Sequence, residues 1–141
     1  DVQAAIINSD VAQERLKAMR EQKEFKANIK EVEKLQEEHN NLVAKLKKDS
    51  AVMNQEQLQA QTEKISEKRS DIAHVYRKLK ASEQKLMQDV VQELGPTLQE
   101  VVNKMIKDDK IGMILDAKAT LHVTNDYNIT AKVTDKINQA K

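Results

Sequence analysis

Apolar residues recur at intervals of seven along two long stretches of the chain. The first stretch carries Ala18, Phe25, Val32, His39 and Leu46 at this interval, and the second carries Leu58, Ile65, Ile72, Leu79 and Leu86. Both stretches lack glycine and proline and are rich in helix-forming residues. A sustained seven-residue repeat is typical of helices that pack along one stripe in a left-handed supercoil. We therefore predict two long helices, over residues 11–48 and 54–94.

The two repeats stay in phase if the chain reverses its direction between them. The helical pattern breaks at residues 49–54, so the tip of the predicted hairpin lies there. Each layer then pairs residues whose numbers add to 104, such as Val32 with Ile72. Val75, Tyr76 and Val90 are predicted to be secondary seam positions, which fill the other side of the seam. The main predicted seam residues of this antiparallel coiled coil are Phe25, Ile29, Val32, Val43, Leu46, Leu58, Ile65, Ile72, Leu79 and Leu86.

Local signals mark the ends of these helices. Asp10 with Gln13, and Asn54 with Gln57, have the spacing of a capping box. Gly95 and Pro96 predict an interruption after residue 94, because proline removes a hydrogen-bond donor and clashes with the preceding turn. The pair is either a hinge or a fixed kink, and the helical pattern resumes over residues 97–108.

Outside the hairpin the pattern favours short strands. Residues 2–8, 111–116 and 119–124 read as strands, the last two joined by a turn at residues 116–118, and a final helix carries Ile129, Val133 and Ile137. The predicted fold is α+β, mostly α. It has a coiled-coil hairpin, or tentacle, over residues 11–94 and a small β-containing oligomerisation base from residues 1–10 and 95–141. The predicted core of the base comprises Ile6, Ile111, Met113, Leu115, Leu121 and Val123.

Composition makes a monomer a poor solution. Only 39% of the residues are hydrophobic and 2% are aromatic, whereas 33% are charged. Large side chains normally supply most of the buried area, and short strands leave open edges. We therefore predict self-association through the strands, with a monomer that has a flexible base as the alternative.

The two ends of the chain resemble the Skp/OmpH family. The resemblance is carried by AAIINSDVAQ near the start, by the hairpin, and by IGMILDAKATLHVTNDYNITAKVTDKINQAK at the end. It implies an ATP-independent holdase chaperone of the Gram-negative periplasm. In that family three copies join through a β body, and their tentacles surround a cavity that shelters unfolded outer-membrane proteins. The start at Asp1 rather than at a methionine suits a mature chain after signal-peptide removal.

Charge is unevenly distributed along the predicted hairpin. Residues 42–80 contain nine basic and five acidic residues, a net charge of +4, whereas the whole chain carries +1. This distal half either attracts acidic unfolded chains or anionic surfaces, lipopolysaccharide included, or is an ordinary solvated face. At the tip, Val52 and Met53 either close the end of the seam or contact a client. The candidate contact residues are Lys45, Lys47, Lys48, Lys68, Arg69, Val52 and Met53.

No catalytic motif is present. The chain has two glycines and no cysteine, which leaves no phosphate-binding loop and no zinc-thiolate spacing, and its three histidines do not form a metal set. We predict no enzyme activity, no cofactor and no nucleic-acid partner. A prefoldin-type chaperone is disfavoured by the order of the predicted elements. An oligomeric coiled-coil scaffold or spacer remains the alternative function.

Overall fold

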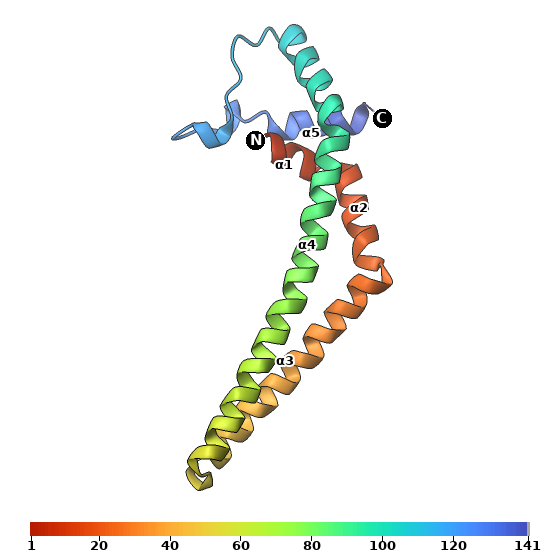
Figure 1. The fold of residues 1–141 in the computed structure, drawn as a ribbon. Helices are drawn as coiled ribbons and strands as arrows, with labels where there is room; N and C mark the ends of the chain where they lie inside the picture. Colours follow the sequence, from red (N-terminus) through yellow and green to blue (C-terminus); the bar gives the residue numbers. More distant parts are fainter. Residues whose placement is uncertain (141) are drawn as a thin grey trace. The chain divides into compact units, whose positions relative to one another are not determined.

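A computed structural model describes residues 1–140 of the chain, and it is mostly helical (Figure 1). The chain divides into two compact units, which we call the base (residues 1–18 and 83–140) and the hairpin (residues 19–82). The helices and 3₁₀ turns are α1 (Val2–Ile7), α2 (Asp10–Glu21), α3 (Lys23–Asp49), η1 (Ser50–Val52), α4 (Gln55–Asp108), η2 (Ala117–Ala119), η3 (Asn125–Tyr127) and α5 (Thr130–Gln139). Helix α4 contributes to both units. The expectation of a mostly helical protein is confirmed, but no strand is present within residues 1–140.

The base is held together by one apolar cluster between α1, α2, α4 and α5. Its largest members, Ile6, Met105 and Ile137, are each no more than 2% exposed. The other buried members are Ala5, Ala12, Val90, Leu94, Val101 and Val133. Burial of these side chains from four helices supplies the main free energy that holds the base in place.

The prediction of a strand over residues 2–8 is wrong, because this segment is helix α1. The Asp1 carboxylate accepts a hydrogen bond from the backbone N–H of Ala4 (3.0 Å) and caps the helix. Ala5 and Ile6 are buried while Val2 is half exposed, so the apolar positions follow a helical period. Thr134 of α5 closes the contact by donating its hydroxyl hydrogen to the carbonyl oxygen of Ala5 (3.0 Å).

Helix α2 begins at Asp10, but the predicted capping box of Asp10 and Gln13 is wrong. The hydroxyl oxygen of Ser9 accepts from the backbone N–H of Ala12 (3.4 Å). The backbone N–H of Asp10 instead donates to Oδ1 of Asn138 (2.9 Å), and Nε2 of Gln13 donates to the carbonyl of Ile7 (2.8 Å). These bonds fix the start of α2 to α1 and α5.

The two strands expected within residues 111–124 are not formed, although the turn between them is. Lys110 adopts a left-handed conformation (φ 51°) just after the end of α4. The Asp116 carboxylate accepts from the backbone N–H of Lys118 (2.8 Å), and η2 makes the turn. An isolated pair of strands is only marginally stable, and residues 2–7, the expected third strand, form helix α1 and cannot extend it.

The hairpin is built from α3, the 3₁₀ turn η1 and the first part of α4. Helix α4 opens with the predicted capping box: the backbone N–H of Gln57 donates to Oδ1 of Asn54 (2.9 Å), and that of Asn54 donates to Oε1 of Gln57 (3.0 Å). An ion pair between Glu38 and Lys68 (2.7 Å) joins the antiparallel α3 and α4. This agrees with the expected reversal near residues 49–54.

The first long helix is interrupted, which the sequence pattern did not indicate. Gln22 has an extended conformation (φ −62°, ψ 141°) and separates α2 from α3. The backbone continues to bond across the break, from the N–H of Gln22 to the carbonyl of Met19 and from the N–H of Lys26 to the carbonyl of Gln22 (3.0 Å each). An ion pair between Lys26 and Glu21 also spans it.

The expected end of the helix at residue 94 is wrong, because α4 continues through Gly95 and Pro96; a kink or hinge at this pair stays a prediction. Pro96 leaves the carbonyl of Gln92 without its usual helical partner. Gln92 and Pro96 are exposed, so water can donate to this carbonyl. Leu94 and Val101, on either side, are buried in the same cluster, which keeps the helix in one piece.

We expect the substitution Ile6→Ala to lower the free energy of unfolding by about 2–4 kcal/mol, because it leaves a cavity where α1 meets the rest of the base. Urea unfolding followed by circular dichroism measures the change. The neighbouring substitution Ile7→Ala is the matched control, because Ile7 is 36% exposed. Equal effects at the two positions would contradict the packing described for α1.

The substitution Gly95→Ala should raise the free energy of unfolding by about 0.5–1 kcal/mol, since alanine has the higher helix propensity. Apart from its two chain neighbours and the backbone of its own helix, a Cβ atom on Gly95 would meet no atom within 4 Å. Ala81→Gly, at an exposed position of the same helix, is the control and should lower it by a similar amount. A loss of stability in Gly95→Ala would contradict the prediction and show that the new Cβ atom clashes with the ring of Pro96.

Candidate binding surfaces

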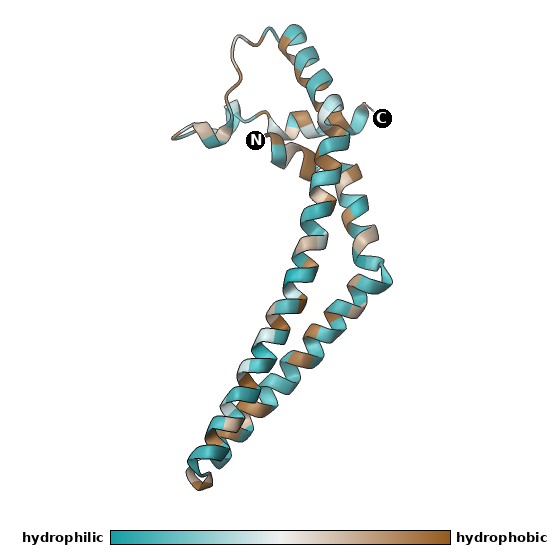
Figure 2. Cartoon of the chain, in the orientation of Figure 1, coloured by the Kyte–Doolittle hydropathy of each residue, from teal (hydrophilic) through white to brown (hydrophobic). Residues whose placement is uncertain are grey.

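The seam of the hairpin follows alternating steps of three and four residues. The seam residues, all buried or partly buried, are Phe25, Asn28, Val32, Leu35, His39, Leu42 and Leu46 in α3 and Leu58, Gln61, Ile65, Lys68, Ile72, Val75 and Leu79 in α4. Hydrophilic residues cover most of the remaining surface of both helices (Figure 2). This spacing is that of the core positions of a coiled coil.

Most of the predicted seam residues lie on this stripe, but some do not. Ile29 is 39% exposed and Tyr76 is 54% exposed. Val43 is partly buried beside Leu42. Leu86 packs against the apolar cluster of the base. The apolar seam residues that the sequence reasoning missed are Leu35 and Leu42, and the three-four spacing is the signal that identifies them.

Burial along the seam is uneven. Val32, Val75 and Leu79 form a buried cluster, against which Phe25 and Leu35 pack. Between residues 33 and 74, all of which the structure describes, every seam residue is only partly buried. The part of the hairpin closer to the tip therefore gains less from apolar burial than the cluster does.

Polar side chains occupy the middle of this less buried part. Lys68 makes its ion pair with Glu38, which also lies 3.8 Å from Lys34. The hydrogen bond from Lys68 holds the pKa of the Glu38 carboxyl below its usual value, and the same bond raises the pKa of Lys68. His39 lies on the seam at the same level, with Nδ1 3.5 Å from Oδ1 of its neighbour Asn40.

Gln61 places a polar atom inside the seam, and this atom makes no hydrogen bond. Its Oε1 atom is buried and has no hydrogen-bond partner. A buried polar atom without a partner loses its hydration and gains nothing in return. We call Glu38, His39, Gln61 and Lys68 the polar layers of the hairpin.

The predicted basic contacts are distributed over the outer surface near the tip. Lys45, Lys47, Lys48 and Arg69 are exposed, whereas Lys68 is partly buried in its ion pair. At the tip, Val52 in η1 is 86% exposed and therefore does not cover the end of the seam, while Met53 is partly buried.

The base presents a separate apolar surface between the end of α4 and the start of α5. We call it the apolar loop, residues 111–127. Met113, Leu115 and Tyr127 are 74%, 62% and 82% exposed, and Leu121 is fully exposed. Ile111 is partly buried against the core cluster, and Val123 is 41% exposed. Of the residues predicted to form the core of the base, only Ile6 is buried in this chain.

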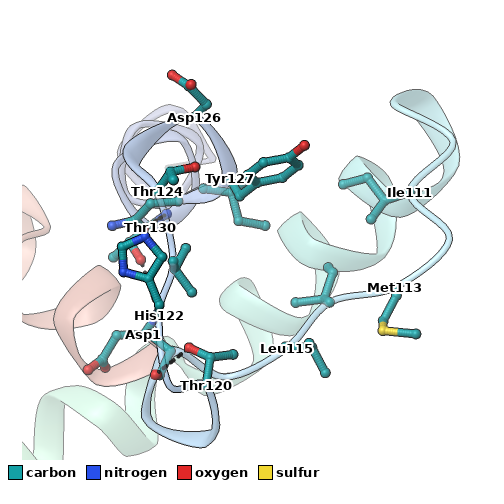
Figure 3. A pocket seen from close by; sticks show the side chains of 15 residues that line it. Asp1, Ile111, Met113, Leu115, Thr120, His122, Thr124, Asp126, Tyr127 and Thr130 are labelled. Atoms are coloured by element: carbon teal, nitrogen blue, oxygen red, sulfur yellow. Dashed lines mark hydrogen bonds between the residues drawn. The ribbon is translucent and has the colours of Figure 1, made fainter.

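The apolar loop encloses an open pocket of about 630 Å³. Ile111, Met113 and Leu115 reach it from one arm of the loop, and His122 and Tyr127 from the other (Figure 3). Asp1 and Thr130 line its edge. The lining is mainly apolar, so this surface suits contact with another apolar surface.

No group that suggests metal chemistry is found in the part of the chain that the structure describes. Among residues 1–140, no three His, Asp or Glu side chains gather closely enough to hold a metal ion. No helix in the same range is long and apolar enough to span a bilayer.

Comparison with known proteins places the chain in a family. The family described as "Outer membrane protein (OmpH-like)" matches residues 1–137, so this chain belongs to the OmpH-like family. The chain is also similar to a Skp-like protein of Pseudomonas aeruginosa, with 24% identity over 139 residues, which cover 99% of this chain and 82% of that protein. No solved structure matches the chain.

We expect Gln61→Leu to raise the free energy of unfolding by about 1 kcal/mol, because it removes an unsatisfied polar atom and adds apolar contact within the seam. Thermal and urea unfolding measure the change. Gln59→Leu, at an exposed position of the same helix, is the control and should change stability little. A destabilised Gln61→Leu variant would show that the amide makes a hydrogen bond in solution.

Proposed function

We propose that this protein is an ATP-independent holdase chaperone of the periplasm, which binds unfolded outer-membrane proteins and prevents their aggregation. The observation that carries the proposal is the match of the OmpH-like family to residues 1–137, which is nearly the whole chain. The similarity to a Skp-like protein supports it.

The surfaces of the chain suit a function of this kind. A holdase requires no reacting group, but it requires extended surface that makes many weak contacts. The hairpin offers two helices whose outer faces carry exposed basic residues, among them Lys45, Lys47 and Arg69. A net charge of +4 over residues 42–80 attracts acidic segments of an unfolded chain, or anionic lipid such as lipopolysaccharide, over about one Debye length.

Self-association is the second part of the proposal. The apolar loop exposes Met113, Leu115, Leu121 and Tyr127, and an exposed apolar patch of this kind is typical of an interface. We propose that copies of the chain join through this loop, in the homotrimer that the family resemblance implies. The hairpins of the three copies would then enclose the client between them.

The test dilutes a urea-unfolded outer-membrane β-barrel protein into buffer with and without this chain. We expect suppression of light scattering in the absence of ATP. Multi-angle light scattering after gel filtration should give a complex with three chains of 16.1 kDa for each client. Leu121→Asp, which places a charge on the proposed interface, should dissociate the assembly and weaken suppression.

Two outcomes would each contradict one part of this proposal. A stable trimer that leaves aggregation unchanged would favour the alternative, an oligomeric coiled-coil scaffold or spacer. A chain that remains monomeric at micromolar concentration with the client bound would contradict the trimer while leaving the holdase in place.

A further inference from the structure

The hairpin is weakest where the polar layers cross its seam. Between the Glu38–Lys68 ion pair and the tip, the apolar seam residues Leu42, Leu46 and Leu58 are only partly buried. On the other side, Val32, Val75 and Leu79 are each no more than 7% exposed. The two sides therefore differ in how much apolar contact is lost when α3 and α4 separate.

Separation of α3 and α4 near the tip also exposes the polar side chains of the seam to water. Oε1 of Gln61, which has no partner in the closed hairpin, gains hydrogen bonds from water. Glu38 and Lys68 exchange their contact for solvent at little cost, because their side chains are 37% and 31% exposed in the closed form. The capping box of Asn54 and Gln57 lies within the tip itself and is unaffected, so α4 keeps its start while the seam opens.

We propose that the hairpin opens locally over residues 36–71 and that its own seam then binds the apolar side chains of an unfolded polypeptide. This inference rests on the proposed holdase function and identifies the surface that it uses. The binding residues are Leu42, Leu46, Leu58 and Ile65, which lie on the facing stripes of α3 and α4.

The charges around the open seam are mixed. Residues 36–71 carry six basic and seven acidic side chains. The charged border therefore does not select clients by the sign of their charge, and the open seam recognises a client segment by its apolar side chains.

The proposal is tested by cross-linking α3 to α4, so that the seam cannot open. The chain has no cysteine, so Glu38→Cys with Lys68→Cys provides two thiols only. The two native side chains meet at 2.7 Å, which places the thiols within reach of a short bismaleimide linker. We expect the linked chain to need at least about fivefold more protein for half-suppression of client aggregation, because the binding-competent open state is removed.

Two controls separate the effect of the cross-link on suppression from the effects of the substitutions and of the maleimide modification. The same double variant blocked with a monofunctional maleimide carries the substitutions without the link, so the effect of the link is the difference between the linked and the blocked samples. Arg15→Cys with Glu93→Cys, linked in the same way, replaces an ion pair of 2.5 Å within the base and should leave suppression unchanged.

A second variant stabilises the closed seam without a chemical cross-link. His39→Leu combined with Gln61→Leu replaces polar seam residues by apolar ones, and we expect it to suppress aggregation several-fold less well than the unmodified chain. Suppression unchanged in both the linked and the leucine variants would overturn the seam proposal and leave the holdase standing. No suppression by the unmodified chain would overturn the holdase itself.

Discussion

The three-four spacing of apolar residues along α3 and α4 is the constraint on which the hairpin depends. In a pair of helices only one stripe of each is covered, so all the burial that stabilises the pair comes from that stripe. The outer faces are free to carry the charged residues that make up 33% of the chain. The same stripe admits polar residues at Gln61 and Lys68, and these weaken the hairpin near its middle without preventing it from folding.

The periodic part of the fold was predictable from the sequence, and the parts that depend on a neighbour were not. The seven-residue repeat located both helices and the turn between them, and the local spacing of Asn54 and Gln57 located their capping box. Ile29 was misplaced because it lies four residues after Phe25 and three before Val32, whereas the seam takes the polar Asn28 between them. The two isoleucines of residues 2–7 resemble a strand until Ile6 is known to pack against Val133 and Ile137 of α5 in one cluster. Pro96 predicts a break, and only the buried residues on both sides explain why α4 continues.

The candidate surfaces were likewise predictable from the sequence only in part. The basic residues near the tip follow from the sequence, because charge is a property of each residue. Gln61 does not stand out in the sequence, since its importance lies in a buried oxygen atom without a partner. The apolar loop was recognised as apolar, but its exposure in a single chain was not predictable, because residues 2–7 were expected to form a third strand beside it. An apolar surface left open in one chain and a seam that opens easily are both suited to a protein that binds other chains.

Hydrogen–deuterium exchange of the free chain, resolved by peptide mass spectrometry, tests the central claim that stability is graded along the hairpin. The account predicts that amides of residues 36–71 exchange through an opening that costs less free energy than the opening of residues 25–35 and 72–79, which hold the buried cluster of Val32, Val75 and Leu79. Equal protection of the two regions, with all amides exchanging through one global unfolding, would contradict it.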